Sequence, residues 1–248
     1  LATQTLLAKK AKNMLVRVDG TLARGVTAKD IVLAVIGRIG TAGGTGYTIE
    51  FGGSAMRALS MEGRMTVCNM AIEAGAKGGI IEADETVIAY LRGRTDKKYP
   101  IYKSDPDAEY REIIEIDVTN IEPQISLPYL PSNVKPISQI GTIRIDQVVL
   151  GSCTNGRIED LRIAAEILKG RHIATGCRLI VIPATPAVYR QAMAAAGTPF
   201  TFSTTFFHVV PPSRLTCRLP SFVPTHTTPG ARGDSATVVM TLVVATPS

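Results

Sequence analysis

The sequence lacks several features that mark particular classes of protein. It has no run of about 18 apolar residues, so we expect no helix that crosses a membrane. No signal-peptide pattern opens the chain. Its Lys and Arg residues give a formal net charge of +6, but they form no cluster interleaved with aromatic residues. We therefore expect neither a membrane protein nor a nucleic-acid-binding protein.

Cysteine and histidine are also scarce. The chain has four cysteines, too few and too widely spaced for a secreted disulfide framework, so reduced thiols in a cytoplasmic protein are expected. Its three histidines stand in no recognisable motif beside a nucleophile, which disfavours a Cys–His catalytic pair. With 45% hydrophobic and 19% charged residues, the composition is that of an ordinary soluble globular protein.

Hydrophobic residues alternate along the chain between strand-type and helix-type patterns. Leu15, Val16 and Val18 predict a strand, and Thr27 followed by Asp30 is typical of a capped helix start. Further elements are expected in chain order: a strand at 47–51, helices at 61–76 and 84–91, a polar linker at 97–107, and an irregular Pro-containing segment at 123–136.

The clearest pattern lies between residues 145 and 195. A β-type run at 145–150 precedes a helix at 158–168, and a second apolar run at 178–182 precedes a helix at 187–195. This order and spacing predict a right-handed βαβ unit with parallel strands. The chain is therefore expected to be an α/β protein.

Cys153 lies between the first of these strands and the helix that follows. Open α/β sheets bind ligands at the carboxyl ends of their strands, and a helix start favours an anion. Both effects favour the thiolate, which is the form that ligates metals. A small buried cysteine in a tight turn explains the same position about equally well.

Asn69 and Glu73 are four residues apart in a predicted helix, so they are expected to share one face. A carboxamide and a carboxylate together could hold a metal-bound water. A solvated polar face is the alternative, and spacing alone favours it. Cys68 and Cys177 lie among apolar residues and are expected in the core.

The loop Gly43-Gly44-Thr45-Gly46 is a weak candidate for a phosphate cradle. It lacks the Lys of a P-loop and does not match the dinucleotide-binding fingerprint. An ordinary glycine turn is the better interpretation.

Several of these segments resemble motifs of the aconitase family. Gly151-Ser152-Cys153-Thr154-Asn155 is similar to the motif that carries the first cluster cysteine, and residues 61–76 and 43–46 resemble two further signatures. Ala2-Thr3-Gln4-Thr5 also resembles a family segment. The similarity runs from about residue 1 to 197. Residues 157–162 look most like the isopropylmalate dehydratase branch, with homoaconitases as close relatives.

The resemblance implies a fold and a chemistry. The fold would have aconitase-like layered domains with mostly parallel sheets in three αβα layers. The activity would be a hydro-lyase that isomerises 2-isopropylmalate and 3-isopropylmalate, by dehydration and rehydration, in leucine biosynthesis. A 4Fe-4S cluster held by three thiolates would supply a Lewis-acidic iron. The substrate would be a small hydroxy-di- or tricarboxylate, and the partner a small subunit that carries a swivelling domain.

Carried onto this sequence, the resemblance makes Cys153 a cluster ligand and Asn155 a donor to a cluster sulfur. Asn69 would neighbour the cluster, and Glu73 would face the substrate hydroxyl or a water. The family also has a C-x-x-C about sixty residues after the first cysteine, where this chain has only Cys217. One thiolate is therefore missing, and the chain alone is expected to bind a cluster poorly and to be inactive.

The composition changes abruptly after residue 197. Residues 198–248 contain no Lys, Glu or Ile, which suggests an out-of-frame or misassembled segment. The alternatives to a dehydratase are a homoaconitase or aconitase fragment and a non-catalytic, cluster-free α/β fragment. The expected organisation is the end of a truncated preceding domain at 1–13, an α/β domain at 14–112, a cluster-bearing domain at 113–197, and a divergent, poorly packed tail at 198–248.

Overall fold

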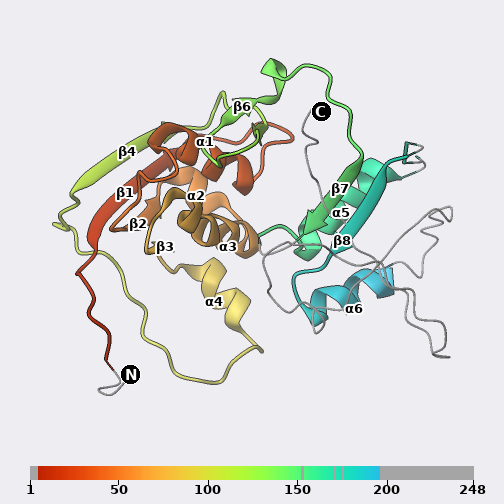
Figure 1. Cartoon of the computed structure of the whole chain (residues 1–248). Coiled ribbons are helices and arrows are strands. Elements are labelled where there is room, and N and C mark those ends of the chain that lie inside the picture. Colours follow the sequence, from red (N-terminus) through yellow and green to blue (C-terminus); the bar gives the residue numbers. More distant parts are fainter. Residues whose placement is uncertain (1–4, 152–153, 170, 172, 175, 196–248) are drawn as a thin grey trace. The chain divides into compact units, whose positions relative to one another are not determined.

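A computed structural model describes the chain except for residues 1–4, 152–153, 170, 172, 175 and 196–248 (Figure 1). The chain divides into two compact units, Leu1–Thr142 and Ile143–Ser248. Cys153, Cys217 and the whole expected tail lie outside the described residues. We describe each unit by itself.

A four-stranded parallel sheet forms the centre of the first unit. Its strands are β1 (Lys12–Asp19), β2 (Tyr47–Gly52), β3 (Gly78–Ile80) and β4 (Glu112–Asp117). Their order in the sheet is β3-β2-β1-β4, and every neighbouring pair is parallel. The mostly parallel α/β architecture expected from the sequence is confirmed.

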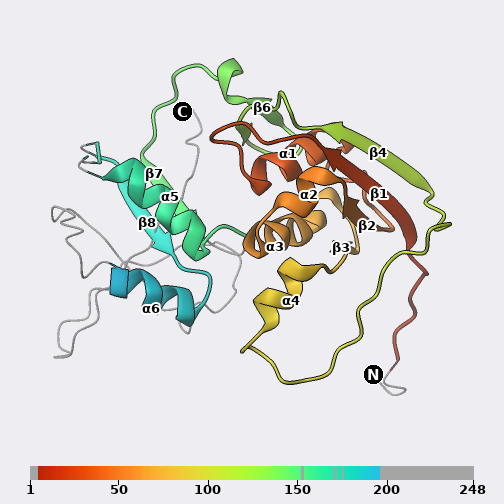
Figure 2. The ribbon, with the colours of Figure 1, turned by 180° about the vertical axis from the view of Figure 1, so that it is seen from behind.

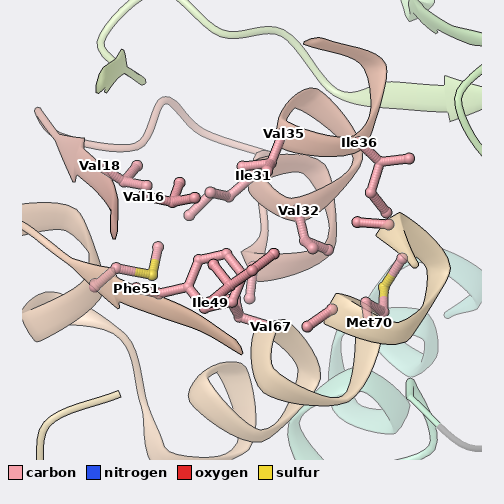
Figure 3. Close-up of a cluster of buried hydrophobic side chains, with 14 of the residues drawn as sticks. Val16, Val18, Ile31, Val32, Val35, Ile36, Ile49, Phe51, Val67 and Met70 are labelled. Atoms are coloured by element: carbon pink, nitrogen blue, oxygen red, sulfur yellow. The ribbon is translucent and has the colours of Figure 1, made fainter. Parts of the chain in front are cut away.

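Three helices cover one face of this sheet: α1 (Ala28–Ile39), α2 (Ser54–Ala58) and α3 (Met61–Met70) (Figures 1 and 2). Two of the three expected layers are thus present in the described part of this unit. The core lies between these layers, because alternate strand side chains point toward the helices. Figure 3 shows these buried side chains around β2, α1 and α3, among them Ile49, Phe51, Ile31, Val35, Val67 and Met70.

Helix α1 begins as the sequence predicts. Oδ2 of Asp30 accepts hydrogen bonds from the backbone N–H and the hydroxyl of Thr27, each at 2.7 Å. Its other carboxylate oxygen accepts from the backbone N–H of Gln124 at 2.6 Å. Gln124 opens a small hairpin of β5 (Gln124–Ser126) and β6 (Val134–Pro136), followed by the short helix η2 (Ile137–Gln139). Asp30 therefore caps α1 and ties it to the hairpin.

The helix expected at 61–76 is not a continuous α-helix. Helix α3 ends at Met70, and the 3-10 helix η1 (Ala71–Ala74) continues the chain to Gly75, whose φ is +82°. Ser60 caps the start of α3 by accepting from the Gly63 N–H at 3.1 Å. The next helix, α4 (Glu85–Leu91), is capped by Asp84, as expected.

The second unit contains the predicted βαβ arrangement. Strands β7 (Gln147–Gly151) and β8 (Arg178–Ile182) are parallel, with α5 (Ile158–Leu168) between them in the chain and α6 (Pro186–Ala195) after them. Leu179 and Val181 of β8 are buried, and half-buried residues of β7 and α5 pack against them: Val148, Leu150, Leu161, Ala164 and Leu168.

The two compact units meet at 142/143, whereas the sequence places a domain boundary at 112/113. The difference arises because β4 pairs with β1 along residues 112–117 and so belongs to the first sheet. None of the helices in the described part of the chain is both long and apolar enough to span a membrane.

Candidate functional site

Glu73 carries the most unusual carboxylate in the first unit. It lies in η1, directly before the buried residue Ala74. Its Oε2 atom is buried and has no hydrogen-bond partner among the described residues. A buried carboxylate oxygen without a donor is costly, and native proteins nearly always satisfy such atoms. The position is therefore suited to a donor that the described residues do not supply.

Asn69 lies one turn earlier, in the last turn of α3. It is exposed, whereas Glu73 is half-buried. The change from α-helix to 3-10 helix between them alters the four-residue spacing on which a shared face was predicted. The two residues are four positions apart in the chain, but the side chain of Asn69 is exposed and that of Glu73 is partly buried.

Arg64 anchors the helix that leads to this turn. Its side chain is buried, and its two terminal nitrogens bond the two carboxylate oxygens of Asp84 at 2.7 Å each. The same guanidinium also donates to the carbonyl oxygens of Leu59 and Arg57. The hydrogen bonds from Arg64 lower the pKa of Asp84 to about 2. The pair fixes α3 against the start of α4.

Sequence reasoning did not identify Arg64 as a structural residue. Asp84 was predicted only as a helix cap, a role that it also fills through the N–H groups of Thr86 and Val87. The available signal was position: Arg64 lies between Gly63 and Val67, on the face of α3 that packs into the core. A charged residue on such a face requires a partner.

The glycine-rich loop at 41–46 does not offer its amides to a phosphate. The N–H groups of Gly43, Gly44 and Thr45 donate to the carbonyl oxygens of Gly40, Ala74 and Ala42 at 2.8 to 3.2 Å. A phosphate cradle needs such groups to point at the ligand. The interpretation as a structural turn is therefore supported.

In the second unit, the backbone at the end of β7 lies very close to the end of β8. Gly151 has a φ of +125°, and a Cβ there would collide with the carbonyl oxygen of Ile182. A Cβ on Gly156 would meet the same oxygen, and Gly156 accepts a hydrogen bond from the Ala184 N–H at 2.8 Å. The two glycines therefore allow the backbone at positions 151 and 156 to lie close to the end of β8.

Asn155 is held at the start of α5. Its Nδ2 donates to Asp160 at 3.3 Å, and its Oδ1 accepts from the Thr154 hydroxyl at 3.2 Å. The backbone N–H of Arg157 donates to Asp160 at 3.0 Å. Nε of Arg157 is buried and has no partner in the part of the chain that the structure describes. The start of α5 thus has a fixed geometry, and Nε of Arg157 is a buried donor that the described residues leave unused.

The cysteines that the structure describes do not fit a cluster site. Burial raises the pKa of the Cys68 thiol to about 11, which favours the neutral thiol. Sγ of Cys177 lies 3.9 Å from the carbonyl oxygen of Arg178. Both are half-buried, not fully in the core as expected. The described residues also contain no group of three or more His, Cys, Asp or Glu side chains that could hold a metal ion.

Comparison with known proteins identifies the relatives of this chain. The family model for the aconitase family (aconitate hydratase) matches residues 1–142 and 133–218. The second match continues past residue 197, where the resemblance was expected to end, and includes Cys217.

Curated relatives give a more specific similarity. The 3-isopropylmalate dehydratase large subunit of Moorella thermoacetica is 52% identical over 194 residues, which cover 78% of this chain and 46% of that protein. The Heliobacterium modesticaldum large subunit is 52% identical over 71% of this chain and 42% of its own length. Large subunit 1 of the 3-isopropylmalate dehydratase of Pyrococcus furiosus is 54% identical over 71% of this chain and 42% of its own length. The chain thus spans less than half the length of these relatives.

Proposed function

The chain belongs to the aconitase family, and we propose that it is part of the large subunit of a 3-isopropylmalate dehydratase. The proposed reaction is the interconversion of 2-isopropylmalate and 3-isopropylmalate by dehydration and rehydration. Relatives at 52% to 54% identity carry this name, which favours this branch over homoaconitase or aconitase.

The structural observation that carries the proposal is the buried Oε2 of Glu73, which has no hydrogen-bond partner in the described part of the chain. A hydroxyl on the substrate, or a water, would donate a hydrogen bond to this oxygen. Removal of the hydroxyl as water requires that group to be held and oriented, which a fixed carboxylate does well. We therefore assign Glu73 as the residue that faces the reacting hydroxyl or water.

Two amide side chains, those of Asn69 and Asn155, are proposed to lie beside the cluster. Asn69 stands at the end of α3, within one turn of Glu73, and is assigned a place beside the cofactor. Asn155 already donates one Nδ2 hydrogen to Asp160, and a carboxamide has two. The second hydrogen is the one assigned to a cluster sulfur, a kind of contact that tunes such centres.

Cys153 is the proposed ligand of a 4Fe-4S cluster. About sixty residues later, where the family has a C-x-x-C, this sequence has a single cysteine, Cys217. When bound, such a cluster supplies an iron with an open position, which acts as a Lewis acid toward a hydroxyl and a carboxylate. A cysteine just before a helix start is in a position that favours the thiolate, because the helix dipole is positive there. Two cysteines are one fewer than the three thiolates that the family uses.

We further propose that the protein acts in the cytoplasm, in leucine biosynthesis, as the large subunit of a heterodimer. The term large subunit in the names of the relatives supports a small-subunit partner. The proposed substrates are small hydroxydicarboxylates.

Substrate turnover tests the assignment within the family. The chain would be extended to the length of its relatives and assembled with a small subunit. We expect conversion of 2-isopropylmalate, with homocitrate and citrate turned over far more slowly. Preferential turnover of homocitrate or citrate would instead assign the chain to one of the alternative branches.

Iron and sulfide analysis tests the competing proposal of a cluster-free fragment, which the shortage of cysteines favours. After anaerobic reconstitution, the chain alone should bind fewer irons than the four of a complete cluster. The iron that does bind should be lost in Cys153→Ser and kept in the control Cys68→Ser. Four irons per chain would contradict the expected deficit, and retention of iron by Cys153→Ser would contradict the ligand assignment.

A further inference from the structure

The glycine-rich loop at 41–46 packs against the turn that carries Glu73. The backbone N–H of Gly44 donates to the carbonyl oxygen of Ala74 at 2.8 Å. Ala74 is the residue directly after Glu73 and is almost fully buried. A loop some thirty residues earlier in the sequence thus binds the backbone of the proposed catalytic turn.

The contact leaves no room for a side chain on Gly44. A Cβ there would lie 2.9 Å from the Ala74 carbonyl oxygen, 3.0 Å from the Ala76 nitrogen and 3.1 Å from the Ala76 Cβ. Real Cβ atoms are essentially never within 3.0 Å of backbone oxygen. A side chain at position 44 would therefore require the loop or the turn to shift.

The approach is equally close from the side of the turn. A Cβ on Gly75 would lie 2.9 Å from the hydroxyl oxygen of Thr45 and 3.0 Å from the carbonyl oxygen of Thr41. Gly75 also has a φ of +82°, which ends η1. Glycines on both sides of the contact thus allow the loop to touch the end of η1.

Hydrogen bonds on either side hold both partners in place. The Thr41 hydroxyl donates to the Ser132 hydroxyl at 2.8 Å, which ties the loop to the segment between β5 and β6. The Tyr47 N–H donates to the Gly44 carbonyl at 2.9 Å, and the Lys77 N–H donates to the Tyr47 carbonyl at 2.8 Å. Hydrogen bonds therefore hold the loop at Thr41, before Gly44, and hold the chain at Lys77, just after the turn.

We propose that this loop braces the Glu73 turn and that Gly44 is a positioning residue for Glu73. The importance of this position for catalysis rests on the proposed function, but the brace itself does not. Any side chain at position 44 would push on the carbonyl of Ala74, next to the residue whose carboxylate oxygen must stay buried and available. The glycine-rich loop, a weak phosphate-cradle candidate in the sequence, would thus serve to position the Glu73 carboxylate.

Three glycine variants separate the brace from a general loss of stability. Gly44→Ala places a methyl group against the turn. Gly43→Ala places one against Ile39 at the end of α1, a collision at least as severe in which the three nearest atoms all belong to Ile39 and none to the turn. Gly78→Ala meets nothing within 4 Å and serves as the neutral control.

The readout is carbodiimide labelling of Glu73 in the full chain, measured by mass spectrometry, with the exposed Glu115 as internal reference. Gly44→Ala should raise the labelling of Glu73 relative to Glu115 several-fold, because the turn opens locally. Gly43→Ala and Gly78→Ala should leave the ratio at its wild-type value. An unchanged ratio in Gly44→Ala, or an equal rise in Gly43→Ala, would overturn the proposal.

Amide hydrogen exchange in the unaltered chain gives a second test, which does not depend on whether Gly44→Ala folds. The Gly44 amide should exchange as slowly as the Lys77 amide, since both are bonded across the contact. Exchange of Gly44 at the rate of an open loop would refute the brace. Neither measurement involves turnover, so a Glu73→Gln enzyme with full activity would refute the proposed function and leave these results intact.

Discussion

Arg64 and Asp84, twenty residues apart in sequence, form a bidentate ion pair in which both nitrogen–oxygen distances are 2.7 Å. The Arg64 side chain is only 3% exposed, whereas that of Asp84 is 37% exposed. The guanidinium is therefore the member of the pair that depends more on its partner, because almost none of its surface is accessible to water.

Loss of this pair should destabilise the first unit. Asp84→Asn leaves a buried guanidinium without its counter-charge, and we expect the free energy of unfolding to fall by about 2 kcal/mol or more. The control is Arg17→Gln, which breaks the exposed ion pair of Arg17 with Glu115 and should cost less than about 1 kcal/mol. Urea unfolding followed by circular dichroism measures both, and equal effects would contradict the burial argument.

Stability should also fall in acid through Asp84. Its pKa is lowered to about 2, so the folded state holds the carboxylate charged where an unfolded chain begins to protonate it. The stabilisation is present above about pH 4 and is lost as the pH falls through about 2. The wild-type chain should thus lose more stability than Asp84→Asn between these values. Parallel pH profiles of the two proteins would show that the pair contributes nothing there.

Asp30 should contribute more than an ordinary helix cap. It accepts two hydrogen bonds from Thr27 and one from the backbone of Gln124, whereas Ser60 accepts one from the backbone of Gly63. We expect Asp30→Asn to cost about 2 kcal/mol and Ser60→Ala about 1 kcal/mol. Thermal unfolding of both variants measures the difference. A cost no larger for Asp30→Asn would show that the bond to Gln124 adds little.

The local parts of this fold are readable from the sequence. The cap formed by Thr27 and Asp30, the strand at β1 and the strand–helix–strand order around Cys153 depend on residues close together in the chain, and they are present as predicted. The bond from Gln124 to Asp30 spans 94 residues and has no local signature. No strand was predicted at β4 for a related reason, because charged residues are interspersed along it and its pairing with the distant β1 has no local signature.

The candidate site shows the same division. Glu73 was identified through a resemblance, but the sequence did not predict that the helix tightens after Met70 or that one carboxylate oxygen is buried without a donor. The turn that carries both features also contacts Gly44, which lies about thirty residues away in sequence. The roles expected of Cys153 and Cys217 stay predictions, since both lie outside the described residues.

Cys68 should be an unreactive thiol in the folded chain. Burial raises its pKa to about 11, so at pH 8 nearly all of it is the neutral form, which is a poor nucleophile. Iodoacetamide should therefore modify Cys68 much more slowly in the native chain than in urea, as measured by peptide mass spectrometry. Native and denatured rates of similar size would contradict its placement beside Asn69 in the last turn of α3.

The most direct test of the proposed function is the turnover number of Glu73→Gln in the enzyme of full large-subunit length, assembled with a small subunit and acting on 2-isopropylmalate. The matched control is Ile72→Ala, which alters an exposed neighbour on the same turn. We predict that kcat falls by about 100-fold or more in Glu73→Gln with little change in KM, and that the control retains normal kcat. Wild-type kcat in Glu73→Gln would contradict the assignment of this turn to the active site.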